Sequence, residues 1–223
     1  MDERFTIAIL GGTGAEGSGL AMRWAKAGHR VIIGSRNATK ASSAADELKK
    51  ALGSQAELKG LENKAAASAA DIVVLTVPFS AQSQTVGDVQ AQLAGKILID
   101  ATAPLVPPKV SRVQLPPGGS AVAAIQKSLG ESVKVVSAFQ NVSAHHLKDL
   151  AHDVDCDVLI CGNDPTARET VVRLAGDIGL RGIHAGPIAN SAAAEALTSI
   201  LISINIRYKI PGAGIRVTGL PTS

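Results

Sequence analysis

Short apolar runs alternate along the chain with longer segments in which apolar and polar residues recur at helical spacing. The apolar runs contain mainly Val, Ile, Leu and Ala, which is typical of strands buried on both faces. The clearest of them lie at 5–10, 31–34, 71–77, 96–100 and 134–139. This alternation predicts an α/β fold built on a Rossmann-type, doubly wound parallel sheet.

Helices are predicted between these runs, and a weaker alternation continues to the C-terminus. The predicted helices lie at 18–27, 38–52, 63–70, 81–93, 120–129, 165–178 and 190–208. Shorter strands are expected at 56–61, 157–161 and 182–185. The Pro-Pro-Gly-Gly-Ser segment at 116–120 is the strongest break in the pattern. The 223 residues fit one large domain or two small ones.

Composition and charge remove several classes of protein. Net charge is only +3, the basic residues are scattered, and aromatic content is 2%, so nucleic-acid binding is not expected. No apolar stretch reaches the roughly 20 residues that cross a membrane, and we do not expect the N-terminal residues to act as a signal peptide. Cys156 and Cys161 fall on opposite faces of a predicted strand, and no Cys/His cluster suggests a metal site. We expect a cytoplasmic protein that handles small anionic molecules.

A glycine motif follows the first predicted strand. Gly12, Gly14 and Gly17 have G-x-G-x-x-G spacing, which is typical of dinucleotide sites. We expect Gly12 to permit the tight turn, Gly14 to let the backbone approach a pyrophosphate, and Gly17 to let helix and strand pack closely. The free N–H groups and dipole at the helix start would then bind phosphate.

The end of the second predicted strand indicates which dinucleotide binds. NAD-specific folds usually carry an acidic residue there, which accepts hydrogen bonds from the ribose hydroxyls. No acid occurs between residues 31 and 39, whereas Ser35, Arg36 and Lys40 supply a hydroxyl and two cations. These groups suit a 2′-phosphate, so we predict NADP(H) in preference to NAD(H).

The loops after the later strands should line the same cleft, because ligands lie beyond the carboxyl ends of parallel strands. These loops cover 76–79, 101–108 and 140–145. The helix at 190–208 is apolar enough to be buried between domains or subunits. It contains no lysine, which argues against hydroxy-acid dehydrogenases that need a catalytic lysine on that helix.

Several segments, in the right order along nearly the whole chain, are similar to one family. The chain resembles F420-dependent NADP oxidoreductases, also called NADPH-dependent F420 reductases. The matching segments are AILGGTGAEGSGLA (8–21), AGHRVIIGSR (27–36), DIVVLTVP (71–78), KVVSAF (134–139), AGPIANSAAAEALTSILI (185–202) and GAGIR (212–216).

The resemblance implies an NADP-binding Rossmann domain at 1–130 and a smaller C-terminal α/β domain at 131–223 for deazaflavin binding and dimerisation. It implies hydride transfer between NADP(H) and coenzyme F420 in a homodimer, directly between the two rings and without a catalytic acid–base residue. The residues carried over as coenzyme contacts are Gly12, Thr13, Gly14, Ala15 and Glu16 at the phosphate turn, Ser35, Arg36 and Lys40 at the 2′-phosphate, and Val77, Ala144 and Ala213 at the rings.

Two positions depart from the family pattern. Gln140 stands where family members often have histidine, and Glu16 places an acid in the phosphate turn. The side chain of Glu16 is therefore expected to point to solvent. Arg207, Lys209 and Arg216 are candidate anchors for the anionic tail of F420. Two other functions stay open: an NADP-dependent reductase of an imine or carbonyl compound, and a non-catalytic NADPH-binding module.

Overall fold

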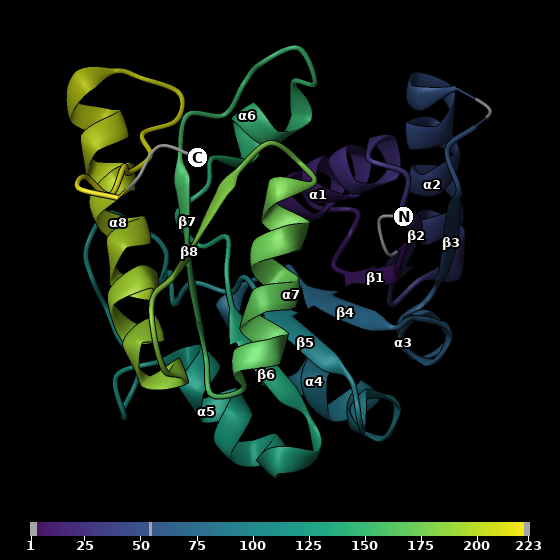
Figure 1. Ribbon diagram of the computed structural model, residues 1–223, viewed down its shortest axis with the longest axis horizontal. Coiled ribbons are helices and arrows are strands. Elements are labelled where there is room, and N and C mark those ends of the chain that lie inside the picture. Colours follow the sequence, from purple (N-terminus) through teal and green to yellow (C-terminus); the bar gives the residue numbers. More distant parts are fainter. Residues whose placement is uncertain (1–3, 54, 221–223) are drawn as a thin grey trace.

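The computed structural model describes residues 4–53 and 55–220, whose strands form an eight-stranded sheet in the order β3-β2-β1-β4-β5-β6-β7-β8 (Figure 1). The first six strands are parallel: β1 (Thr6–Leu10), β2 (Arg30–Ser35), β3 (Leu58–Glu62), β4 (Ile72–Leu75), β5 (Ile97–Asp100) and β6 (Lys134–Ser137). β7 (Asp157–Gly162) is antiparallel to β6, and β8 (Arg181–His184) is parallel to β7. The predicted α/β fold with a Rossmann-type sheet is confirmed.

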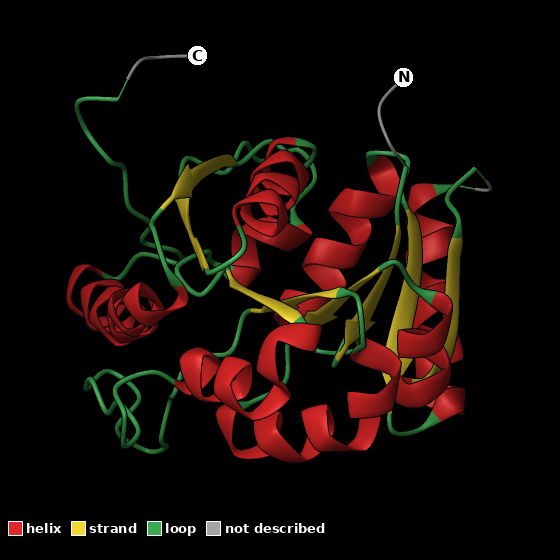
Figure 2. Cartoon of the chain, turned by 60° about the horizontal axis from the view of Figure 1, so that its bottom comes forward, coloured by secondary structure: helices red, strands yellow, loops and turns green. Residues whose placement is uncertain are grey.

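Helices cover both faces of the sheet (Figure 2). They are α1 (Ala15–Lys26), α2 (Ala38–Leu52), α3 (Asn63–Ala69), α4 (Phe79–Leu93), α5 (Ala121–Leu129), α6 (Ala144–Lys148), α7 (Pro165–Gly176) and α8 (Ser191–Tyr208). Successive residues of a strand point to opposite faces, and β1 shows the result. Ile7 and Ile9 pack with α1, α2 and α7, whereas Ala8 and Leu10 pack with α3, α4 and α5.

The sheet continues past residue 130, where the sequence places a domain boundary. β6 pairs with β5 in parallel register, with Ile99 opposite Val136, and the antiparallel β7 then extends the same sheet. The division into 1–130 and 131–223 stays a prediction. Cys156, just before β7, and Cys161 within it are free and buried.

One arginine of α1 holds the segment that contains α6. The Arg23 guanidinium donates hydrogen bonds to the main-chain carbonyls of His146, Leu147, Asp149 and His152, at 2.8–3.0 Å. Gly19, one turn earlier, lets Leu147 approach, because a Cβ at Gly19 would lie 2.6 Å from the Leu147 Cβ. These contacts fix α6 and the residues after it beside the second half of α1.

A buried carboxylate attaches α8 to the rest of the molecule. Glu195 accepts hydrogen bonds from the Ser120 hydroxyl (2.5 Å) and from the main-chain N–H groups of Ala121 (2.7 Å) and Val122 (3.2 Å). These donors form the N-terminus of α5, where the helix dipole favours an anion. α8, which lies beside β7 and β8 (Figure 1), is thereby fixed relative to α5.

Candidate coenzyme cleft

A cleft of about 960 Å³ lies beyond the carboxyl ends of β1, β4, β5 and β6. One side consists of residues that follow these strands, and the other consists of α8 and the C-terminal segment. Most of the lining is apolar, including Val77, Phe79, Val106, Leu201 and Ile202. Open parallel sheets bind ligands at this edge, so the predicted location of the site agrees with the observed cleft.

The glycine turn after β1 is tightly packed, although the roles of Gly11 and Gly12 differ from the prediction. The left-handed backbone lies at Gly11, with φ +83°, and not at Gly12. Gly12 is required for packing, since a Cβ there would lie 2.8 Å from the Ile9 carbonyl oxygen. Gly17 acts as predicted: its Cβ would lie 2.8 Å from the Gly12 Cα, so helix and turn are in direct contact.

The start of α1 is open toward the cleft. Its N-cap is Gly14, which supplies no side chain to cap the helix, and Gly14, Ala15 and Glu16 all line the cleft. The first N–H groups of a helix bind anions readily when no side chain occupies them. Gly12 and Thr13 lie in the same turn outside the lining, and Thr13 is exposed.

Ser35, Arg36 and Lys40 lie next to this turn. β2 pairs with β1 so that Leu10 is opposite Gly34, and the Gly11 N–H donates to the Gly34 carbonyl at 3.2 Å. The Arg36 and Lys40 side chains are exposed, and neither forms an ion pair within residues 4–53 and 55–220. The edge of the sheet therefore presents two free cations beside a helix start that suits phosphate.

The expectation that Glu16 points to solvent is wrong. Glu16 is partly buried in the cleft lining, and burial together with the nearby Asp100 carboxylate raises its pKa to about 8. Burial also raises the pKa of Asp100 to about 6, although Asp100 accepts hydrogen bonds from the Gln82 amide (2.7 Å) and the Thr102 N–H (2.9 Å). Glu16 is thus largely neutral at pH 7, which removes the expected repulsion of a phosphate.

Asp100 and Gln82 were not predicted as site residues, although one sequence pattern points to Asp100. Asp100 is a charged residue at the end of an otherwise apolar strand, the position at which side chains enter a cleft. Its closeness to Glu16 could not be predicted, because 84 positions separate the two residues along the chain. The burial of Glu195 could not be predicted for the same reason, because its hydrogen-bond partners lie at the start of α5, far from it along the chain.

The turn after β6 brings two amides to the cleft. Phe139 has φ +76°, a conformation that is rare outside glycine, and its buried ring packs on Trp24. The chain then turns so that Gln140 and Asn141 line the cleft. Gln140 donates to the Asp100 carbonyl and the Ser137 hydroxyl, both at 2.8 Å, so the glutamine in place of histidine is a buried connector between β5 and β6.

The three residues predicted at the rings all line this cleft. Val77 follows β4, Ala144 begins α6, and Ala213 belongs to the C-terminal segment. The Ala213 N–H donates to the Asn205 side chain of α8 at 2.7 Å. The cleft brings together Gly14, Ala15, Glu16, Val77, Ala144 and Ala213 from distant parts of the chain.

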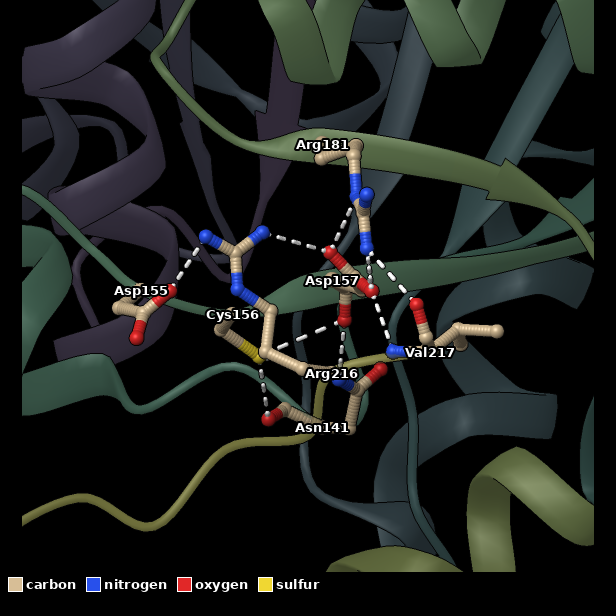
Figure 3. Close-up of polar contacts among 7 residues, drawn as sticks. All are labelled: Asn141, Asp155, Cys156, Asp157, Arg181, Arg216 and Val217. Atoms are coloured by element: carbon tan, nitrogen blue, oxygen red, sulfur yellow. Dashed lines mark hydrogen bonds and ion pairs between the residues drawn. The ribbon is translucent and has the colours of Figure 1, made fainter. Parts of the chain in front are cut away.

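Arg216 is not available to anchor a coenzyme tail. It pairs with Asp155 at 2.5 Å and with Asp157 at 3.1 Å, and both partners are visible in Figure 3. Arg207 and Lys209 are exposed at the end of α8. Within the residues that the structure describes, no group of His, Cys, Asp or Glu is arranged to hold a metal, and no helix is long and apolar enough to cross a membrane.

The fold and the cleft define a dinucleotide-binding oxidoreductase of the Rossmann type. A family model for coenzyme F420-dependent NADP oxidoreductases matches residues 6–104. The F420-dependent NADP reductase of Methanocaldococcus jannaschii is 46% identical over 96% of this chain and 98% of the relative. That of Methanothermobacter marburgensis is 43% identical over 96% and 99%. The chain belongs to the family of F420-dependent NADP oxidoreductases.

Solved structures agree with this assignment. A protein from Arthrobacter sp. FB24, proposed to be an F420-dependent NADP reductase, superimposes with a TM-score of 0.80, at 26% identity over 96% of this chain and 99% of that one. A reductive aminase from Aspergillus terreus has a TM-score of 0.60 at 16% identity, over 93% of this chain and 64% of that one, which shows a common fold alone.

Proposed function

We propose that this chain transfers a hydride between NADP(H) and the deazaflavin coenzyme F420. The observation that carries this proposal is one cleft that joins an anion-binding helix start to a large apolar chamber, in a chain 41–46% identical to F420-dependent NADP reductases. Gly12, Thr13, Gly14, Ala15 and Glu16 would hold the pyrophosphate, and Ser35, Arg36 and Lys40 the 2′-phosphate.

The residues present suit NADP(H) on physical grounds. Gly12 and Gly17 keep the turn free of side chains, and the uncapped start of α1 offers N–H donors to phosphate. Arg36 and Lys40 supply cations without an acidic neighbour on the same loop. Neutral Glu16 keeps a negative charge away from the anion.

The chamber beyond the turn suits direct hydride transfer. When bound, the two coenzymes supply the hydride donor and the acceptor carbon. The chain would hold the rings together and exclude water, with the cleft-lining residues Val77, Ala144 and Ala213 as small or apolar contacts. Direct transfer needs no nucleophile or general base from the protein, so catalysis depends on position.

We also propose a homodimer that forms through α8. Ile200, Ile206 and Tyr208 of this helix are 47%, 66% and 70% exposed, and Ile210 just beyond it is 42% exposed. An exposed apolar surface of this kind is typical of a subunit interface. Small-molecule coenzymes are the proposed partners, in the cytoplasm, and the scattered cations do not favour nucleic acid.

The direct test is to mix the protein with oxidised F420 and NADPH and to follow the loss of deazaflavin absorbance. Turnover that depends on both coenzymes supports the proposal. Tight NADPH binding without F420 turnover would overturn it. It would favour a reductase of another small molecule or a non-catalytic NADPH-binding module, which an imine or carbonyl substrate screen would then separate.

A further inference from the structure

One wall of the cleft is a segment without regular secondary structure. Residues 211–217 follow α8 and contain neither helix nor strand, yet Pro211 and Ala213 line the cleft. Such a segment lacks the hydrogen-bond ladder that fixes a strand or helix, so its position depends on contacts with other parts of the chain. We call residues 211–217 the tail wall.

Most of the contacts that hold the tail wall come from β7 and β8. The Asp157 main-chain N–H donates to the Ile215 carbonyl at 2.8 Å, and the Val217 N–H donates to the Asp157 carboxylate at 2.6 Å. The Arg181 guanidinium donates to the Val217 carbonyl at 3.1 Å. On the other side of Ala213, the Asn205 side chain accepts from the Ala213 N–H.

Asp157 is the centre of these contacts (Figure 3). Its carboxylate is fully buried and accepts two hydrogen bonds from Arg181, at 2.7 and 2.6 Å, and one from Arg216 at 3.1 Å. The hydrogen bonds from Arg181 are the largest of the causes that hold the pKa of Asp157 well below its usual range, so it is ionised at neutral pH. Its main-chain carbonyl accepts from the Asn141 amide at 2.6 Å, and Asn141 lines the cleft.

Asp157 itself lies outside the cleft lining and behind it. Any effect of Asp157 on a ligand must therefore pass through the tail wall or through Asn141. A misplacement of about 1 Å at a hydride-transfer site can cost on the order of 100-fold in rate. A contact that fixes the main chain within four residues of Ala213 is close enough to control such a displacement.

We propose that Asp157 is a positioning residue for the deazaflavin ring, because it fixes the tail wall in which Ala213 would contact the ring. This role rests on the proposed function. Asp157 contacts neither coenzyme, and the phosphate turn on the opposite side of the cleft does not depend on it. Loss of the carboxylate contact should therefore impair the use of F420 and spare the binding of NADPH.

The test compares Asp157→Asn with Asp164→Asn. The asparagine keeps the shape of Asp157 but directs an NH₂ group at donors of the tail wall or of Arg181. Asp164 is a matched control, because it also pairs with a cation, Lys134, and accepts a main-chain N–H from Ala167, without contact to the tail wall. We expect kcat/KM for F420 to fall at least tenfold in Asp157→Asn alone, with the Kd of NADPH within twofold of wild type.

A second variant, Val217→Pro, removes the N–H that binds Asp157 and leaves the Asp157–Arg181 pair intact. If Asp157→Asn does not fold, Val217→Pro still tests whether the contact between Asp157 and the tail wall affects the use of F420. The same F420 defect in Val217→Pro, without an additional loss in the double variant, would support one shared contact. Faster tryptic cleavage after Arg216 in Asp157→Asn, which keeps the Arg216–Val217 bond, would report directly that the tail wall has been released.

Unchanged F420 kinetics in Asp157→Asn and Val217→Pro would overturn the positioning role and leave the proposed function in place. Equal losses for F420 and NADPH would also overturn it, because they would indicate general damage to the fold. A wild-type protein that does not reduce F420 would overturn the proposed function, and this role with it.

Discussion

The Glu16 carboxyl should make the stability of the protein depend on pH in a way that one substitution abolishes. Its pKa is raised from 4.5 to about 8 by burial and by Asp100. Below pH 4.5 the carboxyl is neutral in both the folded and the unfolded chain. Between pH 4.5 and about 8 the unfolded chain releases the proton and the folded chain keeps it, so stability falls as pH rises. Above about pH 8 the loss is complete.

The magnitude follows from the linkage relation. Each pH unit within that window costs about 1.4 kcal/mol, so from pH 6 to pH 8 the wild type should lose about 2–3 kcal/mol through Glu16. The pKa of Asp100 is about 6, so its own loss is largely complete at the start of this interval. Glu16→Gln keeps the side-chain size and cannot ionise. Its advantage over wild type should grow between pH 6 and pH 8, by roughly 5–10 °C in Tm.

Thermal unfolding of wild type and Glu16→Gln from pH 5 to pH 9 measures this difference. Glu47→Gln, which removes an exposed acid of α2, serves as the control and should follow the wild type. The affinity of wild type for NADPH should also fall as pH rises through about 8, because an ionised Glu16 would face phosphate. Parallel stability profiles for wild type and Glu16→Gln would refute the reasoning.

Three further predictions concern other parts of the molecule. In fluorescence titrations, Arg36→Ala should raise the Kd of NADPH roughly 10- to 100-fold and leave the Kd of NADH unchanged. The control Lys50→Ala should change neither Kd. Equal losses of affinity for NADPH and NADH in Arg36→Ala would contradict the 2′-phosphate role. Arg23→Gln should speed amide hydrogen exchange in residues 144–152 at least tenfold, because it loses carbonyl contacts there, and unchanged exchange would contradict this. Ile206→Glu should convert a dimer to monomers in sedimentation analysis; a dimer that persists would place the interface elsewhere.

Apolar patterns predicted the elements well wherever burial on two faces determines the sequence. Apart from Thr6 at the start of β1 and Asp100 at the end of β5, the strands β1, β4 and β5 consist of Val, Ile, Leu and Ala, because helices cover both sides of the sheet. The antiparallel direction of β7 could not be predicted from the apolar pattern, because a buried strand has the same apolar residues in either direction. The five-residue α6 was not predicted, and the loop expected at 140–145 includes its first two residues, because the helix is too short to show helical spacing and is held by Arg23 from α1.

In the site, too, features that depend on neighbouring residues could be predicted, whereas features that depend on the fold could not. Local chemistry is enough to predict the phosphate turn and the Arg36 loop as coenzyme contacts, because there the backbone and a few neighbouring residues decide what could bind. Glu16 was misjudged because its surroundings depend on Asp100, which only the fold brings near. The pairing of Arg216 with Asp157 was invisible for the same reason, since the two residues lie on separate segments that meet behind the cleft.

The contacts that Arg23 makes have a consequence for mutational tolerance. Each of its acceptors in residues 146–152 is a main-chain carbonyl, which every amino acid provides. Side chains in this segment can therefore be exchanged without loss of the contacts, provided that Leu147 still packs on Gly19. Apart from Leu147 and from His146, whose ring stacks on His152, the rim of the cleft beyond Ala144 can vary in charge and size, because an arginine on a different helix holds its main chain.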